Sequence, residues 1–533
     1  MPDNEQLYFN GDIHTVDDSR PEADAVAVKN GIISAVGSIE ECESCLSGDC
    51  EKIDLEGKAL LPGFIDVHLH PVVMVFYEMN VDLGGVVSLD RMRVKLREAS
   101  EKLPPGEWVV GLNFDEHSMD DPTLPTRHDL DKACPDRPAI VLRHDAHLVV
   151  ANTKVIEAIG ISADTPDPEA GVIEREPDGR PSGIFLETAA YAVLGAMPMP
   201  DVPLLVEGAK SVFNKLLSHG ITSMGIVLQT DEEGPAGAAG KFDVLAMQLF
   251  LEHAPVNMYT LLIAEDLEKI DAARGTGLHT DIPGGNRVGG VKIYTDGSFG
   301  ACTAYMNEPY ADRPDTRGFP MHEPEELYRR MVEAQEKGLQ VTLHAIGDAA
   351  NRMCVDLFER LVKEHPIGEH RHRIEHASQL DEKTIADISR LGIVVATQPL
   401  FIHSEKHWLH KRLGVDRAKW TYPFRSLLDA GVKVAGASDA PIESTSVLDA
   451  IQCCVTREGF EPHQSITAAE AVRMFTIDAA YAQFEDDVKG SITPGKRADM
   501  VVLGENPVKI NPEKIHEILV ERTIVGGKTV YRR

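Results

Sequence analysis

Six side chains of the kinds that bind metal ions stand at the ends of short apolar segments in this sequence of 533 residues. Two of them, His68 and His70, are separated by one residue, and alternate residues of a β-strand point to the same side. They can therefore offer two imidazoles to one ion. The full set consists of His68, His70, Lys292, His344, His376 and Asp439. Imidazole and carboxylate ligands suit Zn2+ and similar divalent ions, so the set predicts a metal centre.

The prediction depends on the combination of these residues. A single histidine at a strand end is more often held by a structural hydrogen bond, but four histidines, a lysine and an aspartate are hard to explain by packing. Lys292 lies between Val291 and Ile293, where a charged amine is costly to bury. We therefore expect Lys292 to be paired, neutral or chemically modified.

The segments that carry these residues alternate with helical patterns such as Leu204–Ser218 and Glu325–Lys337. Eight strands are predicted: Gly63–His68, Ile221–Ile226, Val256–Ile263, Val288–Tyr294, Gln340–His344, His372–His376, Ile393–Gln398 and Val432–Ser438. Eight βα units predict an α/β fold whose parallel sheet closes into a (β/α)8 TIM barrel. Catalytic residues of such barrels lie at the carboxyl ends of the strands, and the six side chains stand there.

The two ends of the chain differ from its middle. Both contain short β segments, with predicted hairpins at Lys29-Asn30-Gly31, at Glu56-Gly57 and at Gly526-Gly527. They predict a small β-sandwich domain formed by residues 1–62 and 490–533, with two separate β-arms as the alternative. The barrel then spans 63–489. About 150 residues separate its first two strands, which predicts an inserted subdomain at about 80–200.

The composition narrows the choice of partners. The formal net charge is −32, which argues against nucleic acid and against an anionic membrane, because both attract clustered Lys and Arg. Neither a signal peptide nor an apolar run long enough to span a bilayer is visible, so we expect a cytoplasmic protein. Cys42, Cys45 and Cys50 have no identifiable fourth ligand, and we expect them to be surface thiols on a small helix.

Several motifs, taken together, resemble a known family. They are LLPGFIDVHLHP (60–71), VKIYTDGSFG (291–300), HAIGDAAN (344–351), RIEHAS (373–378), ATQP (396–399), ASDAP (437–441) and the tail GSITPGKRADMVVLGENP (490–507). The combination resembles the amidohydrolase superfamily of metal-dependent barrel hydrolases. Within it, the chain looks most like amidohydrolase family 3, which includes YtcJ-like and N-substituted formamide deformylase-like proteins. The resemblance covers nearly the whole chain.

The resemblance implies a role for each of the six residues. His68 and His70 would bind the more buried metal ion together with Asp439, and the second ion would lie on His344 and His376. Lys292 would bridge the two ions as a carboxylated lysine. Some relatives hold one ion, and Lys292 is then a plain amine. Zn2+ is the first choice of metal, although Mn2+, Fe2+ and Ni2+ share these ligands.

The function implied is hydrolysis of a C–N bond in an amide, a formamide or a cyclic amide. Metal-activated hydroxide would attack the carbonyl, with Asp439 as general base and then general acid. A deaminase or an ester or lactone hydrolase on the same scaffold would use the same ligands and stays an alternative. A non-catalytic metal-binding regulatory protein is a more remote alternative. The expected partner is a small-molecule substrate, and association into a homo-oligomer stays open.

Three further residues are candidates for substrate binding. Arg143 and His147 lie in the predicted insert, which leaves the barrel next to the H-x-H motif of strand one. Asp296 lies four residues after Lys292 and on the same face of its segment.

Overall fold

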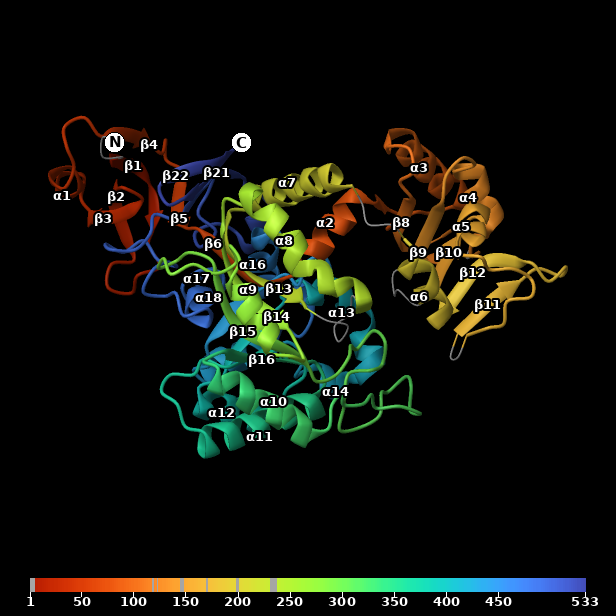
Figure 1. The fold of residues 1–533 in the computed structure, drawn as a ribbon. Coiled ribbons are helices and arrows are strands. Elements are labelled where there is room, and N and C mark those ends of the chain that lie inside the picture. The colour runs from red at the N-terminus through yellow and green to blue at the C-terminus, as the bar shows by residue number, and fades with distance from the viewer. Residues whose placement is uncertain are drawn as a thin grey trace. The chain divides into compact units, whose positions relative to one another are not determined.

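The computed structural model describes residues 5–116, 119–121, 123–143, 148–168, 171–197, 201–230 and 237–533. The chain forms two compact units, one made of Met1–Val72 with Phe213–Arg533 and the other of Val73–Val212. The first unit contains a barrel and a sheet built from both ends of the chain, and the second contains a sheet of its own (Figure 1).

Eight parallel strands form the barrel in chain order. They are β6 (Phe64–Leu69), β13 (Ile221–Gln229), β14 (Asn257–Ile263), β15 (Arg287–Tyr294), β16 (Gln340–Ala345), β17 (Arg373–His376), β18 (Val394–Thr397) and β19 (Val434–Gly436). Each overlaps one of the predicted strands, and the prediction of a (β/α)8 barrel is confirmed. β13 and β16 are buried along their whole length, because such strands face a packed interior on one side and helices on the other.

Helices that follow the barrel strands along the chain cover the outside of the barrel (Figure 1). They include α8 (Asp243–Phe250), α9 (Glu268–Arg274), α10 (Pro324–Glu336), α11 (Asp348–Glu364), α12 (Glu382–Leu391), α13 (Phe401–Leu413), α15 (Phe424–Asp429), α16 (Val447–Thr456), α17 (Ala468–Met474) and α18 (Ile477–Ala482). The ends of α12 follow from its residue types: the Asp381 side chain accepts a hydrogen bond from the Thr384 amide at 2.7 Å, and Gly392 ends the helix with a φ of 68°.

The barrel closes between its first and last strands without a ladder. Backbone ladders join every neighbouring pair from β6–β13 to β18–β19, but among the described residues none joins β19 to β6. Instead, the Asp439 amide donates to the His68 carbonyl at 2.8 Å, and the His70 amide donates to the Ala440 carbonyl at 2.8 Å. We call this contact between residues 66–70 and 438–440 the closing seam.

Strands from both ends of the chain lie in one sheet. Its order is β22 (Lys528–Arg532), β21 (Val520–Val525), β20 (Met500–Leu503), β5 (Ala59–Pro62), β1 (Glu5–His14), β2 (Glu22–Lys29) and β3 (Ile32–Gly37), and β4 (Glu51–Asp54) also pairs with β1. The hairpins predicted at Lys29-Asn30-Gly31 and at Gly526-Gly527 are present as β2–β3 and β21–β22.

The hairpin predicted at Glu56-Gly57 is wrong. β4 pairs with Gln6–Phe9 and β5 pairs with Asp12 and Ile13, both in parallel with β1. The turn therefore carries the chain forward along β1, where the Gly57 amide donates to the Asn10 carbonyl at 2.8 Å. β1 has ten residues, so it is long enough to pair with both strands.

The expectation of surface thiols on a small helix is wrong for Cys42, and Cys50 is half-buried and lies after the helix. Cys42 lies on α1 (Ile39–Ser44) but is fully buried, and its Sγ donates to the Ala25 carbonyl at 3.4 Å. It packs with Leu7 and other apolar side chains of the terminal sheet, because this position of α1 faces the sheet. Cys45 is exposed.

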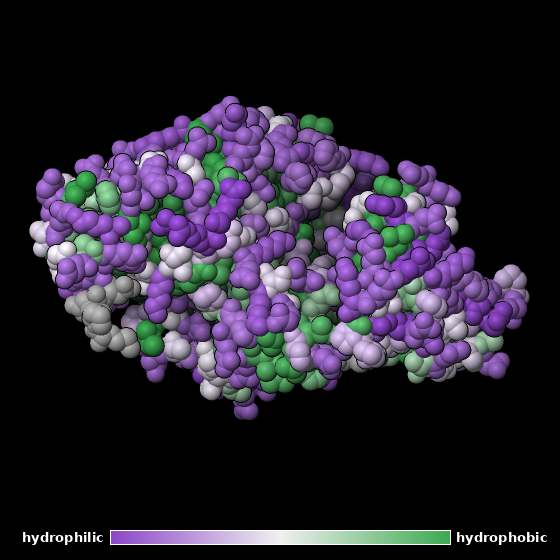
Figure 2. All heavy atoms as spheres, turned by 90° about the horizontal axis from the view of Figure 1, so that it is seen from above, coloured by the Kyte–Doolittle hydropathy of each residue, from purple (hydrophilic) through white to green (hydrophobic). Residues whose placement is uncertain are grey.

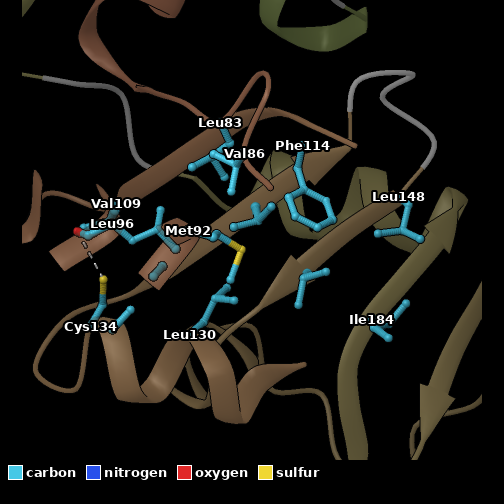
Figure 3. Close-up of a cluster of buried hydrophobic side chains, with 14 of the residues drawn as sticks. Leu83, Val86, Met92, Leu96, Val109, Phe114, Leu130, Cys134, Leu148 and Ile184 are labelled. Carbon is cyan, nitrogen blue, oxygen red and sulfur yellow. Dashed lines mark hydrogen bonds between the residues drawn. The ribbon is translucent and has the colours of Figure 1, made fainter. Parts of the chain in front are cut away.

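The second unit is a six-stranded sheet with helices. The strand order is β11 (Gly171–Arg175), β12 (Pro181–Glu187), β10 (Leu148–Ala151), β9 (Ala139–Arg143), β8 (Val109–Phe114) and β7 (Val81–Asp82). On one face, α3 (Leu89–Lys102) and α4 (Arg127–Ala133) supply Met92, Leu96 and Leu130 to a core with Val109 and Phe114 (Figure 3). Further helices of this unit are α5 (Thr153–Ala158) and α6 (Thr188–Gly195).

Hydrophilic residues cover most of the face seen in Figure 2, and hydrophobic residues are exposed on it in small groups. The excess of acidic side chains contributes to this surface, since the chain has 85 Asp and Glu against 53 Lys and Arg. Within the described ranges, no helix combines the length and the apolar character needed to cross a bilayer.

The core in Figure 3 leads to a stability prediction. Leu96→Ala removes a fully buried side chain from α3 and is expected to lower the free energy of unfolding of the second unit by about 2–5 kcal/mol. Hydrogen exchange of the β8 and β9 amides measures this loss. Val94→Ala on the same helix is the control, because Val94 is 41% exposed. Equal protection in Leu96→Ala and Val94→Ala would contradict the packing described here.

Candidate metal centre

Three of the predicted metal ligands meet across the closing seam. His68 lies near the end of β6, His70 follows that strand directly, and Asp439 follows β19. Oδ1 of Asp439 lies 3.3 Å from Nε2 of His68 and 3.1 Å from Nε2 of His70. One potential ligand atom from each residue lies within 4.8 Å of the others, which is close enough for one ion to be shared.

The other three predicted ligands lie beside them. The ring centroids of His344, near the end of β16, and His376, at the end of β17, are 4.4 Å apart, and those of His68 and His376 are 5.4 Å apart. Nζ of Lys292 lies 3.5 Å from Nε2 of His68. The fold therefore brings all six side chains to one end of the barrel, although their roles as ligands stay a prediction.

Three of the imidazoles have one nitrogen anchored by the protein. Nδ1 of His68 lies 2.6 Å from Oε2 of Glu375, and Nδ1 of His376 lies 2.8 Å from Oε1 of Gln398. Nε2 of His344 lies 3.1 Å from the Gly297 carbonyl, while its buried Nδ1 has no hydrogen-bond partner among the described residues. An anchored nitrogen carries the proton and leaves the lone pair of the other one for a metal. The donor set therefore fits a divalent ion.

The protonation states of these histidines agree with that fit. Burial lowers the pKa of His68 to about 4 and that of His376 to about 3. Burial also holds the pKa of His344 well below its usual value. All three imidazoles are therefore neutral at pH 7, which is the form that binds metals.

Glu375 and Arg373 form a fully buried ion pair beneath His68, which the sequence analysis missed. Nε of Arg373 donates to Oε1 of Glu375 at 2.8 Å, and its terminal nitrogen lies 2.7 Å from the same oxygen. Burial alone would raise the pKa of Glu375, but the charge of Arg373 and the contact with His68 lower it to about 2. Two charged residues at i and i+2 of a predicted barrel strand were the available signal, since they share one face and require partners there.

Lys292 is completely buried, as its apolar neighbours in the sequence predicted. Burial lowers the pKa of its amine to about 8. Nζ also lies 4.8 Å from the centre of the Tyr294 ring, whose face attracts a cation. A pKa near 8 leaves a part of the amine neutral at pH 7, and the neutral amine is the form that reacts with CO2.

Asp439 and His376 both adopt left-handed backbone conformations, with φ of 57° and 71°. Residues other than glycine avoid this region unless the surrounding structure holds them there. Burial alone would raise the pKa of Asp439, but the contacts with His68, His70 and His376 hold it well below its usual value. Asp439 is therefore a carboxylate at neutral pH.

The residues predicted to bind substrate have other surroundings. Asp296 is buried and its carboxylate accepts the amides of Tyr305, Ile346 and Gly347 at 2.8–3.0 Å, which favours a role in holding loops at the barrel end. Arg143 ends β9 in the second unit, and one of its terminal nitrogens lies 3.2 Å from Oε1 of Glu116. Its role in binding substrate stays a prediction. His147 lies outside the described residues.

Comparisons with known proteins agree with this site. The sequence profile of a family described as the amidohydrolase family matches residues 51–531. The chain is 31% identical over 548 residues to YtcJ of Bacillus subtilis, covering 99% of both chains. It is 30% identical over 544 residues to the N-substituted formamide deformylase of Arthrobacter pascens, covering 99% of this chain and 98% of that one. A crystal structure of an uncharacterized metal-dependent hydrolase from Pyrococcus horikoshii is 26% identical, with a TM-score of 0.78 over 96% of this chain and 99% of that chain.

The buried ion pair leads to a prediction about metal affinity. Glu375→Gln replaces the carboxylate beside Nδ1 of His68 by a neutral amide and leaves the Arg373 charge unpaired, so the contact that orients His68 is weakened. We expect Zn2+ binding to weaken about 10- to 100-fold, measured by competition with a chelator of known affinity. Glu369→Gln is the control, because Glu369 pairs with Arg371 on the same segment but at the surface. Unchanged Zn2+ affinity in Glu375→Gln would contradict the positioning role.

Proposed function

The chain belongs to the amidohydrolase family and is a metal-dependent hydrolase, and from that premise we propose that it cleaves a C–N bond in an amide, a formamide or a cyclic amide. One observation carries the proposal: His68 and His70 meet on the carboxylate of Asp439, and His376, His344 and Lys292 lie beside them, with one nitrogen of three of the buried neutral imidazoles anchored. The name of the relative from Arthrobacter pascens, N-substituted formamide deformylase, supports this choice of bond.

The donor set suits one or two divalent ions, with Zn2+ as the first choice. His68, His70 and Asp439 would hold one ion, and His344 and His376 the other, with Lys292 between them as a carboxylated lysine. When bound, such an ion polarises a carbonyl and lowers the pKa of a water molecule toward neutrality.

Asp439 is the residue proposed to move the proton. Its carboxylate is ionised at neutral pH and lies at the end of the barrel, where it can orient a water molecule and accept its proton at a carboxylate oxygen. Because its pKa is held low, the protonated acid would readily pass that proton to the leaving nitrogen. The hydrogen bond from the Asp439 amide to the His68 carbonyl holds the backbone that carries this carboxylate.

The burial of the six residues indicates the side from which substrate approaches. The side chains of His68 and Lys292 are fully buried. The side chains of His70, His344 and Asp439 are 14%, 10% and 12% exposed to solvent. Substrate would therefore meet the edge formed by these three residues. The buried members, His68 and Lys292, would hold the ions from the side away from substrate.

A substrate panel separates this proposal from its alternatives. Amides, formamides and cyclic amides are offered beside amino-heterocycles, esters and lactones, and the released amine, ammonia or acid is quantified. We expect turnover of at least one C–N substrate by the Zn2+-loaded or Mn2+-loaded protein. Turnover of esters or lactones alone would replace the proposed bond, release of ammonia from a ring amine would identify a deaminase, and a wholly inactive metal-loaded protein would favour a regulatory role.

Asp439→Ala and His344→Ala test the assignment of roles. Each is expected to lower kcat on an identified substrate at least about 10³-fold, because the first removes the proton-transfer group and the second a metal ligand. Circular dichroism checks that both variants remain folded. Asp416→Asn, at a highly exposed carboxylate of α14 (Val415–Ala418), is expected to keep full activity. Full turnover by either alanine variant would refute the assignment.

Carboxylation of Lys292 can be tested separately by NMR. Protein incubated with 13C-bicarbonate and Zn2+ is expected to give a carbamate signal by 13C NMR, because the buried amine is partly neutral at pH 7. Lys292→Arg should lose the signal. A wild-type spectrum without it would leave Lys292 as a plain amine beside a single ion.

A further inference from the structure

The closing seam places the candidate metal ligands on two segments that no backbone ladder joins within the described part of the chain. His68 and His70 lie on one side of the seam and Asp439 lies on the other. The two backbone hydrogen bonds across it connect His68 with Asp439 and His70 with Ala440. Small movements of the segment 438–440 would therefore change the distances among these ligands directly.

A buried side chain adds a third connection across the seam. Oδ1 of Asp66 accepts a hydrogen bond from the Ser438 amide at 3.2 Å and another from the His68 amide at 3.1 Å. Asp66 is 1% exposed and lies on β6 two residues before His68, so it faces the same side as both histidines. One carboxylate oxygen thus accepts a hydrogen bond from each segment, from the amide of His68 itself and from the amide that precedes Asp439.

Among the described residues, the other backbone hydrogen bonds of the segment 438–440 and of Ala437 before it do not reach β6. The Ala440 amide donates to the Ser438 hydroxyl at 3.1 Å, which is a contact within the segment itself. The Ala437 amide donates to the Thr397 carbonyl at 2.9 Å and connects the strand to β18, on the side away from β6. Contacts of the backbone at 438–440 to β6 consequently run through His68, His70 and Asp66.

We propose that Asp66 is a positioning residue that fixes Asp439 opposite His68 and His70 and so preorganises the metal site. The carboxylate does this by accepting the two amides, so an acceptor oxygen at this position is the property that matters. The ligands then require little rearrangement when an ion binds. This inference rests on the proposed metal site for its consequence, but the seam contact that it describes is made by protein groups alone.

Two substitutions separate positioning from general support of the fold. Asp66→Ala removes the acceptor, whereas Asp66→Asn keeps an oxygen where Oδ1 lies. Asp499→Ala is the matched control: Asp499 is also a buried carboxylate that accepts a backbone amide, from Gly526 at 2.7 Å, but it lies in the terminal sheet. Full-length chains are used throughout.

The first readout is metal binding by the full chain. Zn2+ affinity is measured by chelator competition, and the visible absorption of bound Co2+ reports the ligand geometry. We expect Asp66→Ala to weaken Zn2+ binding about 10- to 100-fold and to alter the Co2+ spectrum, whereas Asp66→Asn and Asp499→Ala stay within about threefold of wild type. Wild-type affinity and an unaltered Co2+ spectrum in Asp66→Ala would overturn the proposal.

The second readout needs no metal. Hydrogen exchange of the peptides that contain residues 66–70 and 438–440 is followed in metal-free protein. Asp66→Ala is expected to speed exchange in both peptides more than elsewhere in the barrel, and Asp66→Asn to restore protection. Uniform or absent acceleration would overturn the proposal. If wild type binds neither Zn2+ nor Co2+, the proposed function fails, and the exchange data still decide whether Asp66 closes the seam.

Discussion

Closure of the barrel between β6 and β19 is the constraint on which the candidate site depends. Among the described residues, seven neighbouring strand pairs are joined by ladders, and the eighth contact is made by residues at or just after the strand ends. Those residues include His68, His70 and Asp439, so the same segments complete the barrel and assemble the metal ligands. A barrel that opened at this seam would lose its site before it lost most of its sheet.

Buried charged side chains are the second constraint on this end of the barrel. Lys292, Arg373 and Glu375 are all completely buried, and isolated charges in such surroundings would be strongly unfavourable. Glu375 is shared between Arg373 and His68, which pairs the charges and orients a ligand with the same contact. The polar interior therefore follows from the chemistry that the site requires, whereas the outer faces of the strands pack against helices.

Periodicity and spacing were sufficient to predict the eight barrel strands and the six residues that meet at their ends. The supporting contacts were harder to predict, because Glu375 and Gln398 act on histidines of other strands or loops, and sequence spacing does not show which strands are neighbours. The prediction of a hairpin at Glu56-Gly57 was wrong for a related reason. A glycine turn indicates a change of direction, but it does not show which strand the next segment pairs with. The burial of Cys42 depends on which face of a six-residue helix meets the sheet, and so short a helix has no clear periodicity.

Metal content per folded chain tests the central claim most directly. Protein is produced without chelator or affinity metal, and its bound metals are quantified by mass spectrometry before and after incubation with Zn2+ or Mn2+. The account predicts one or two divalent ions per chain, and two ions would agree with a bridging Lys292. A chain that remains metal-free after incubation would contradict the account, because the anchored neutral imidazoles would then have no ion to bind.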